Sequence, residues 1–474
     1  MKLTTIKYTA IVLIFSLVSC QDLVDGDGNI NVDPNNPVST EYQSVLTTAG
    51  VGQVLVQNGI NSRMAGIFAG THTGIDRQYG GYNSYTVTTS DFDGLWDDIF
   101  VNAFRNARLS RTLAAEQGIT GVTIGICQVL EALSAGTAAS LYGDVPFDEL
   151  SSVEFPNPRF ESQSEVYGKI QSLLDEAITN LNAGTGRPVT NSEIFFDGDP
   201  AAWIEVAYTL KARFYMHTQE YGLAYAAAQN GISGEDHSML APFGTAIEAS
   251  NLNWQLFELE TQGNDIAISD FLVGMVDPSS ASYRGNAKTN ETARFEFLFQ
   301  SSTNGFQLNT TENGFAGQTT PSPIVTFQEN LLILAEAGAR TESFATGLGH
   351  LNDFRTYMSS GGYMLGANAA DIQYDAYDAA DFDNGGIENT DGISSDNALL
   401  REIMEERYIT LLSQIEVFND VRRTMNESDV RVPVQPNSGN QLPQRFLYAQ
   451  SEIDRNENLP TTLPSLFEPT EVNQ

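Results

Sequence analysis

The sequence predicts an all-α protein in which stacked helical hairpins form a scaffold and long loops project from it. Apolar residues recur at helical spacing over most of the chain. Several of these stretches open with capping residues and end at glycine or proline. Helix pairs recur at intervals of roughly 30 residues, which is typical of tetratricopeptide-like units, although no strict period is kept.

The first strong helix is expected from Phe92. Trp96 and Phe100 begin its apolar face, and Ser90 with Asp93 forms a capping-box-like start. The same face continues through the apolar residues Ile99, Ala103 and Ala107.

Two further helices have clear ends. One runs from about residue 119 to Tyr142, where Gly143 and then Pro146 stop it. The next begins at Ser162, where Glu165 completes a capping box.

Later helices are marked in the same way. Asp199 followed by Pro200 starts one, and Thr326 with Glu329 starts another. The expected pairs are 91–142, 164–183 with 200–232, 326–358 and 397–424. Helical periodicity fades in residues 233–320 and 359–394, and we interpret these segments as long loops, the first of them a loop-rich insert that carries binding residues.

The charge of the chain excludes one class of function. The 474 residues include 24 Lys+Arg and 60 Asp+Glu, a net charge of −36. Such a protein repels phosphate backbones, so nucleic-acid binding is excluded. The acidic residues are spread along the chain, which favours a soluble, self-repelling surface, with many divalent-cation sites as the alternative.

The N-terminus predicts the location of the protein. Lys2 and Lys7 precede a short apolar run, and residues 17–20 (LVSC) form a lipobox. We therefore predict a signal peptide at 1–19, a lipidated Cys20, a tether at 20–40 and a single helical domain at 41–474. We expect no other stretch to be long and apolar enough to span a membrane. Cys127 is then an unpaired core thiol.

Seven stretches, in order along the chain, resemble the SusD/RagB family of surface nutrient-binding lipoproteins. The departures are local: Ala449 replaces a proline, and Phe100 and Phe147 replace tyrosines. The similar stretches are Asp33-Pro34-Asn35-Asn36-Pro37; Trp96 with Phe100, Asn102 and Asn106; Leu141 to Phe147 (LYGDVPF); Asp199-Pro200 through Trp203 to Leu210–Phe214 (LKARF); Ile333 to Ala337 (ILAEA); Glu405-Glu406-Arg407 with Asp420 to Thr424; and Arg445 to Tyr448 with Glu452 and Asn456.

The resemblance implies a fold and a role. The fold is a right-handed superhelix of four tetratricopeptide units with ligand-binding loops. The role is binding without chemistry, as a partner of a SusC-type TonB-dependent barrel that the lipoprotein covers. It also implies an outer-membrane lipoprotein facing the cell exterior, and Asp22 and Asp25 just after Cys20 are consistent with that export.

Residues 76–85 (DRQYGGYNSY) are the first candidate ligand site. Aromatic faces bind the C–H side of sugar rings, and nearby polar groups bind the hydroxyls. Arg77, Tyr79, Tyr82, Asn83 and Tyr85 could form such a platform. The alternative is a tyrosine-rich loop packed on the scaffold.

The second candidate region lies within 250–320. Trp254 and Tyr283 are its predicted binding residues, with Phe257, Arg284 and Phe306 nearby in sequence. Trp96 and Trp203 instead lie on apolar helical faces and are predicted to be core residues.

Other charged patterns have structural interpretations. Arg422-Arg423 is expected to pin the C-terminal segment to the scaffold through buried acids, with an anion site as the alternative. Residues 381–386 (DFDNGG) have the Asp-x-Asp spacing of a calcium loop, but the closing Glu of an EF-hand is replaced by Gly392. We predict no cofactor and no metal beyond this possible structural calcium.

Nothing in the sequence indicates an enzyme. The four histidines form no metal-spaced cluster, and His217 lies on a core face. There is no nucleophile elbow and no phosphate loop. The predicted function is capture of an oligo- or polysaccharide for a SusC-type transporter. Capture of peptides is the main alternative, and a purely structural docking surface is a third hypothesis.

Overall fold

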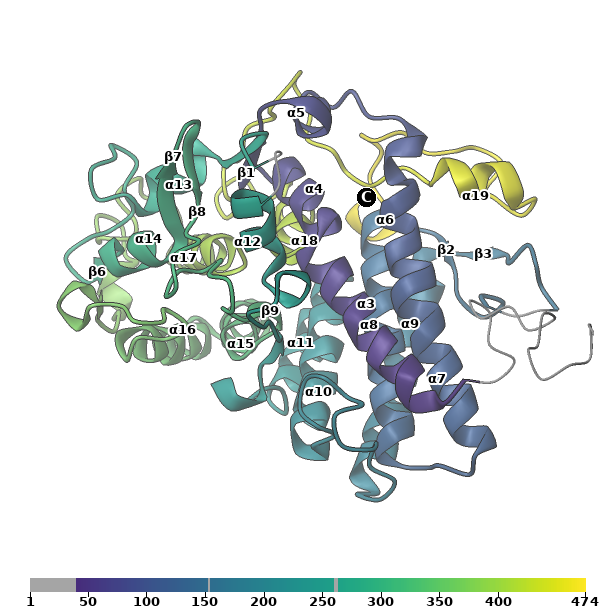
Figure 1. Ribbon diagram of the computed structural model, residues 1–474. Coiled ribbons are helices and arrows are strands. Elements are labelled where there is room, and N and C mark those ends of the chain that lie inside the picture. The colour runs from purple at the N-terminus through teal and green to yellow at the C-terminus, as the bar shows by residue number, and fades with distance from the viewer. Residues whose placement is uncertain (1–39, 152–153, 260–262) are drawn as a thin grey trace, which may run out of the picture.

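The computed structural model describes residues 40–151, 154–259 and 263–474 (Figure 1). The predicted signal peptide, Cys20 and the tether up to residue 39 lie outside the described residues. Where the chain is described, helices form most of the regular structure and only short strands accompany them.

The N-terminal half of the scaffold is a layer of long helices (Figure 1). Helix α3 packs against η2 and α7, and α8 packs against α9. The bounds are α3 (Tyr42–Asn58), α4 (Ile60–Phe68), α5 (Arg77–Asn83), η1 (Thr89–Phe92), α6 (Asp93–Asp97), η2 (Asp98–Phe104), α7 (Arg105–Glu116), α8 (Val122–Tyr142) and α9 (Gln163–Asn182).

Successive helices continue the same layer. Helix α9 packs on α10, α10 on α11, α11 on α15, and α15 on both α16 and α17. The bounds are α10 (Pro200–His217), α11 (Tyr221–Ala228), α15 (Phe327–Thr341), α16 (Phe344–Ser359), α17 (Ser395–Thr410), α18 (Glu416–Arg423) and α19 (Gln450–Arg455). The predicted pairing of residues 164–183 with 200–232 is therefore replaced by another. Helix α9, which contains residues 164–182, pairs with the preceding helix α8, and α10 pairs with α11.

Local helix signals are confirmed at several ends. Ser162 and Glu165 form the predicted capping box, and Asp199 caps α10 with Pro200 in its first turn. Gly143 follows α8 with a φ of 84°. The predicted start at Ser90 and Asp93 is wrong, because a capping box two residues earlier opens η1. Residues 98–104 then form a π-helical segment, which the helical spacing did not indicate.

The segment 233–320 is not the predicted loop but a set of short elements. Strand β5 pairs with the distant β1 (His72–Gly74), in the sheet order β1-β5-β8-β7. These pairings join residues far apart in sequence, which is why local periodicity missed them. The elements are η3 (Glu235–His237), β4 (Met239–Ala241), η4 (Ile247–Ala249), α12 (Leu252–Trp254), η5 (Gln255–Leu259), β5 (Ile266–Ile268), α13 (Asp270–Val276), β6 (Thr289–Asn290), α14 (Thr292–Leu298), β7 (Phe299–Ser302) and β8 (Gly305–Leu308).

Three two-stranded sheets complete the strands of the described chain. They pair β2 with β3, β4 with β9, and β10 with β6. The bounds are β2 (Val145–Pro146), β3 (Phe160–Glu161), β9 (Ser322–Val325) and β10 (Gln373–Tyr374), and the remaining short helices are η6 (Ala369–Asp371), η7 (Ala379–Asp381) and η8 (Glu471–Asn473).

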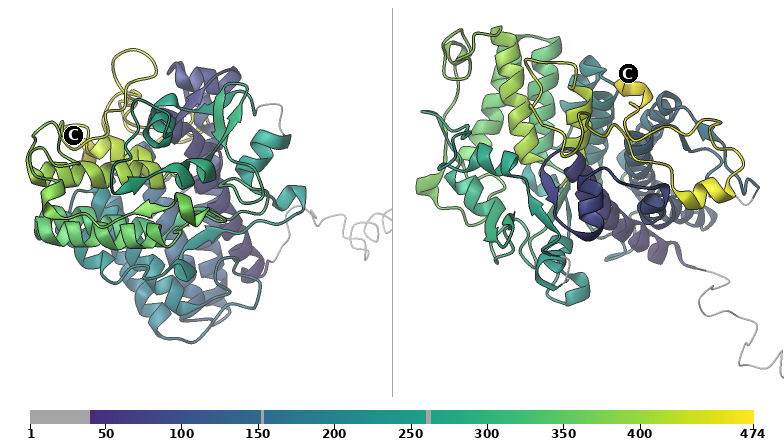
Figure 2. Two further views of the ribbon diagram at one scale, coloured as in Figure 1. Left: turned by 90° about the vertical axis from the view of Figure 1, so that its left-hand side faces the viewer. Right: turned by 90° about the horizontal axis from the view of Figure 1, so that it is seen from above.

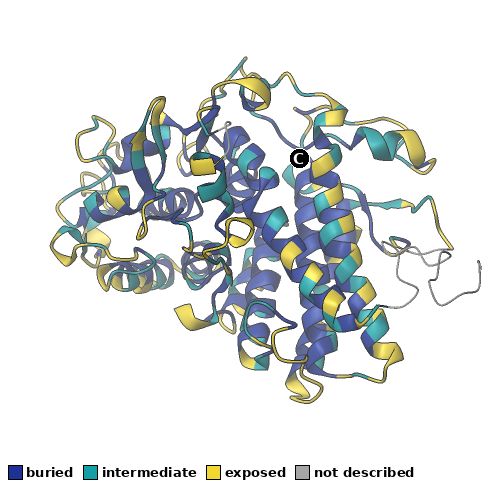
Figure 3. Cartoon of the chain, in the orientation of Figure 1, coloured by how far each residue is buried: buried dark blue, intermediate teal, exposed yellow. Residues whose placement is uncertain are grey.

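One connected apolar core extends from Leu46 to Leu466, and the inner faces of the long helices are buried (Figure 3). Trp96 and Trp203 are core residues, as predicted. Cys127 is a buried free thiol, also as predicted, and burial raises its pKa to about 12.

Helix α8 corrects one expectation about membranes. Its length and composition are sufficient to cross a bilayer, contrary to the prediction that no stretch after the signal peptide is long and apolar enough. However, 94% of its most apolar window is buried inside the protein.

Buried ion pairs hold the C-terminal segment in place. Arg423 contacts Glu336 at 2.5 Å and Asp420 at 2.8 Å, and Arg422 donates to the carbonyls of Ser140 and Gln444 at 2.8 Å each. The prediction is therefore confirmed in part: Arg422 pins the C-terminal segment through carbonyls, whereas the buried acids pair with Arg423 and tie α18 to α15. Figure 2 shows the C-terminal segment, in yellow, running across the N-terminal helices.

Candidate ligand-binding site

The first predicted site folds into the short helix α5. The Asp76 carboxylate accepts the Arg77 amide hydrogen at 2.8 Å, so the helix starts at Arg77. A helical turn places Tyr79 and Tyr82 on one side, and that side faces the core: Tyr79 is 1% exposed and Tyr82 is 4% exposed. The predicted exposed platform is therefore wrong for these two tyrosines, whose rings pack edge-on with centroids 5.9 Å apart.

The other residues of this segment stay at or near the surface. Arg77 is exposed and forms an ion pair with Asp265 at 2.5 Å. Asn83 is partly exposed and accepts the amide hydrogen of Gly74 at 3.2 Å. Tyr85 is also partly exposed, and its hydroxyl accepts the amide hydrogen of residue 437 at 2.9 Å.

The structure brings the two predicted regions together. Arg63, in α4, donates to the Tyr79 hydroxyl at 3.3 Å and to the Leu252 carbonyl at 3.0 Å. Leu252 begins α12, which ends at Trp254. Because Arg77 also reaches across to Asp265, residues 77–83 are connected to Leu252 through Arg63 and to Asp265 directly, and these two residues flank Trp254 in sequence.

We call this region the α5–α12 face and take as its candidate residues the partly or fully exposed Arg63, Arg77, Trp254 and Phe257, the last of which also packs against the core. These residues supply two aromatic rings and two guanidinium groups. This composition suits recognition of hydroxyl-rich ligands, because rings pack on apolar sugar faces and guanidinium groups donate to hydroxyls.

Tyr283 belongs to a different environment. Its hydroxyl accepts the amide hydrogen of Glu291 at 2.8 Å. The neighbouring Arg284 is buried and contacts Glu291 at 2.5 Å, Glu402 at 2.6 Å and Glu406 at 2.8 Å. The structure therefore does not place Tyr283 with Trp254, and its neighbour Arg284 serves a buried ionic network that the sequence did not reveal.

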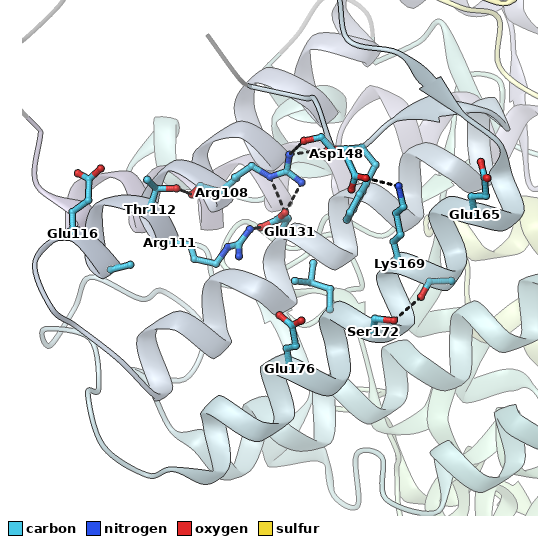
Figure 4. A pocket seen from close by; sticks show the side chains of 14 residues that line it. Arg108, Arg111, Thr112, Glu116, Glu131, Asp148, Glu165, Lys169, Ser172 and Glu176 are labelled. Atoms are coloured by element: carbon cyan, nitrogen blue, oxygen red, sulfur yellow. Dashed lines mark hydrogen bonds and ion pairs between the residues drawn. The ribbon is translucent and has the colours of Figure 1, made fainter. Parts of the chain in front are cut away.

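A groove of about 1020 Å³ lies over α7, α8 and α9 (Figure 4). Arg108 and Arg111 converge on the buried Glu131 at 2.7 and 2.9 Å, and Lys169 contacts Asp148 at 2.6 Å. The basic side chains of the groove are thus paired with protein carboxylates. It contains no predicted site residue.

A smaller pocket of about 130 Å³ lies between the 233–320 segment and the ends of α15 and α17. Its aromatic residues are Phe297, Phe315 and Tyr363. None of its residues was predicted to bind a ligand. Its walls come from parts of the chain far apart in sequence, which no local pattern connects.

The possible calcium loop is occupied by protein contacts. Asp381 receives Lys288 at 2.6 Å, and Asp383 accepts a hydrogen bond from Ser395 at 3.2 Å. Among the described residues, no group of three or more His, Cys, Asp or Glu side chains is placed to hold a metal ion.

His217 is a core histidine, as predicted. Its Nε2 lies 2.6 Å from the Glu416 carboxylate, and its Nδ1 lies 3.0 Å from the Tyr167 hydroxyl. All three residues are buried. The imidazole therefore joins α9, α10 and α18 and has no open position for a substrate.

Together these features define a helical scaffold protein with a composite surface site. Residues 34–449 match the family model SusD-like, described as starch-binding and associating with the outer membrane. The chain belongs to this family, as the resemblance in its motifs predicted. A comparison with curated proteins found no match.

Solved structures share the fold. A SusD/RagB family protein from Bacteroides thetaiotaomicron is 19% identical, with 89% of this chain and 95% of that chain covered and a TM-score of 0.63. A SusD homolog from Parabacteroides distasonis is 15% identical, with 92% and 98% covered and a TM-score of 0.69. A chitin-binding SusD homolog from Flavobacterium johnsoniae is 15% identical, with 87% and 93% covered and a TM-score of 0.61. The predicted superhelix of tetratricopeptide-like pairs is confirmed.

Proposed function

We propose that this protein captures an oligo- or polysaccharide at the cell surface, without chemical change, and delivers it to a SusC-type TonB-dependent transporter in the outer membrane. The observation that carries the proposal is the α5–α12 face, where Arg63 and Arg77 bind Leu252 and Asp265, the residues that flank Trp254 in sequence. Its setting is a family described as starch-binding, and one similar structure is described as chitin-binding.

The electrostatics of the chain favour a neutral glycan. A net charge of −36 repels polyanions at long range. On the α5–α12 face, Trp254 offers an apolar ring for stacking, while Arg63 and Arg77 offer hydrogen-bond donors. The residues of this face include no nucleophile, metal cluster or acid–base pair. We therefore propose that the protein binds the glycan without cleaving it.

The proposed anchoring rests on Cys20. Acyl chains on this residue would hold the protein stably, whereas one chain alone binds a bilayer marginally. We expect Cys20→Ala to move the full-length chain from the membrane fraction to the soluble fraction. Retention of this variant in the membrane would contradict the anchor. Detergent extraction of the wild-type chain should co-purify a TonB-dependent barrel, and purification without any barrel would contradict the partner.

The central experiment uses the soluble form beginning at Gln21 in native gels containing starch, chitin fragments and other neutral polysaccharides. We expect one polysaccharide to retard the wild type, and Trp254→Ala and Arg77→Ala to reduce retardation by at least tenfold. Phe155→Ala is the matched control. Phe155 is 42% exposed, and it lines a different pocket that includes none of the residues of the α5–α12 face. Equal retardation of all four proteins would overturn the site, and release of shorter sugars would overturn the absence of catalysis.

Peptide capture is the alternative. Aromatic and guanidinium groups also bind peptides, so the same proteins should be titrated with a peptide digest by calorimetry. Heat from peptides alone, lost in Trp254→Ala, would replace the glycan with a peptide as the ligand of the α5–α12 face.

A further inference from the structure

The pocket of about 130 Å³ is walled by aromatic and proline side chains. Phe297 in α14 packs near Phe315, with ring centroids 6.0 Å apart, and near Tyr363, at 6.1 Å. Pro321, Pro323 and Leu240 complete the apolar wall, and Leu365, which is 49% exposed, lies at the rim. The pocket therefore offers ring faces and has an accessible mouth.

The floor of the pocket contains two neighbouring hydroxyl groups that lack a well-formed hydrogen bond. Thr410, the last residue of α17, is 4% exposed, and its hydroxyl lies next to that of Tyr363. The hydroxyl oxygen of Tyr363 is likewise buried without a well-formed hydrogen bond. Burial raises the pKa of Tyr363, and the nearby positive charge of Arg294 and the Thr410 hydroxyl oppose the shift. Unsatisfied buried polar groups are costly, so they mark a place where a ligand gains from supplying the partner.

Further polar groups of the lining define the ligand's charge. The amide of Gln328, which is 6% exposed, and the carboxylate of Glu235 belong to the lining, and the lining includes no Lys, Arg or His. An anionic ligand would meet Glu235 without a cation to balance it. The pocket therefore selects against uronic acids and sulfated sugars.

The volume sets the size of the ligand. The volume of about 130 Å³ is roughly ten times the 10–15 Å³ that a cavity needs to hold one water molecule, so the pocket has room for a small ligand such as one sugar ring. Aromatic walls for C–H faces and hydroxyl and amide groups for the ring oxygens complete the match. We propose that this pocket is a second binding site, which takes a single neutral pyranose residue, and this proposal rests on the proposed function of glycan capture.

One residue links the pocket to the α5–α12 face. The side-chain oxygen of Asn251 caps α12 by accepting the Trp254 amide hydrogen at 3.2 Å. Its side-chain nitrogen donates to the Thr320 carbonyl at 2.8 Å and to the Ser322 hydroxyl at 3.0 Å. Thr320 lines the pocket. Asn251 therefore joins the segment that carries Trp254 to the wall of the pocket.

The test separates the pocket from the larger face by ligand size. Wild-type protein is titrated with methyl glycosides of glucose, galactose, mannose and N-acetylglucosamine, with methyl glucuronide as the acidic control, by saturation-transfer NMR and calorimetry. Leu365→Trp closes the mouth. Thr410→Val removes the buried hydroxyl at nearly constant shape, and its thermal midpoint should be unchanged or higher because no well-formed internal hydrogen bond is lost.

We expect one neutral glycoside to bind the wild type and the Trp254→Ala variant equally. Leu365→Trp should abolish this binding, and Thr410→Val should weaken it about five- to tenfold. Four outcomes would overturn the pocket. They are absence of binding by every neutral glycoside, binding by both pocket variants as tight as that by the wild type, preference for the glucuronide, and binding of peptides in place of sugars. If polysaccharide retardation still depends on Trp254 in that case, the proposed function stands without the pocket. If neither glycoside binding nor Trp254-dependent retardation is observed, both the pocket and the proposed function are overturned.

Discussion

The Arg63 guanidinium lies 3.0 Å from the carbonyl oxygen of Leu252, although the two residues are 189 positions apart. The same side chain donates to Tyr79 at 3.3 Å. A residue of the helical scaffold therefore positions the short helix that ends at Trp254. This arrangement makes Arg63 a positioning residue for the α5–α12 face.

We expect Arg63→Met to reduce polysaccharide retardation nearly as much as Trp254→Ala, because α12 loses its tie to α4. Native gels measure the effect, and circular dichroism checks that the helical content is kept. Arg187→Met is the matched control, since Arg187 is exposed and its contact, Asp199, is 4.0 Å away. Full retardation by Arg63→Met would show that α12 is held by other contacts.

Two glycine substitutions test the packing of the helical layer. A Cβ at Gly52 in α3 would lie 2.3 Å from the backbone oxygen of Asn102, whereas a Cβ at Gly168 in α9 meets nothing within 4 Å. Gly52→Ala should therefore lower the free energy of unfolding by about 1–3 kcal/mol, or more. Gly168→Ala should raise it by about 0.5–1 kcal/mol. Urea unfolding measures both, and equal shifts would contradict the close approach of α3 and η2.

The buried Glu336 tests the ionic pin. Burial alone would raise its pKa, but the nearby Arg423 and Arg340 lower it to about 2. Since the folded pKa is below the unfolded value, the stabilisation is complete above about pH 4.5 and is lost as the pH falls toward 2. Glu336→Gln should cost about 3–5 kcal/mol at pH 7, because it leaves buried arginines under-compensated. It should also remove this part of the acid sensitivity.

Urea unfolding between pH 7 and pH 2.5 measures the loss. The exposed Glu312→Gln serves as the control and should follow the wild type throughout. An identical pH profile in Glu336→Gln and wild type would contradict the assignment.

His72 adds a second, higher pH window. Burial lowers its pKa from 6.5 to about 3, and the positive charge of Arg63 adds to this effect. The unfolded chain therefore binds a proton that the folded chain does not, between pH 6.5 and 3. Stability should fall by about 1.4 kcal/mol per pH unit as the pH decreases through this window.

His72→Gln should flatten the stability profile between pH 6.5 and 4.5, above the range in which Glu336 titrates. His237→Gln is the control, because His237 is partly exposed. If the free energy of unfolding of His72→Gln depends on pH as steeply as that of the wild type, another group is responsible for the effect.

The sequence predicted the scaffold well because helix ends depend on neighbours in sequence. The Ser162–Glu165 capping box and the turn at Gly143 are local signals, and both are present in the structure. The buried tryptophans, Trp96 and Trp203, followed from helical spacing alone. These features need no knowledge of distant contacts.

The candidate site was predicted less completely because it depends on long-range contacts. The spacing of Tyr79 and Tyr82 suggested a platform, but a single helical turn directs both rings into the core. Nothing local connects His72 with Ile268 or Arg284 with Glu402, which pair across the fold. Trp254 was identified as the tryptophan outside a strong helix, whereas its neighbours on the α5–α12 face could be found only in three dimensions.

The C-terminal contacts have a consequence for biogenesis. The Phe446 amide donates to the Leu141 carbonyl at 2.7 Å, the Tyr448 hydroxyl donates to the Asp144 carbonyl at 2.9 Å, and the amide of Val472 donates to the Gln163 side chain at 3.1 Å. The α8–α9 hairpin therefore receives its closing contacts from residues translated some 300 positions later. Such long-range closure delays folding until synthesis is nearly finished. A chain threaded through a secretion channel would thus stay loose and translocation-competent until its last segment has passed.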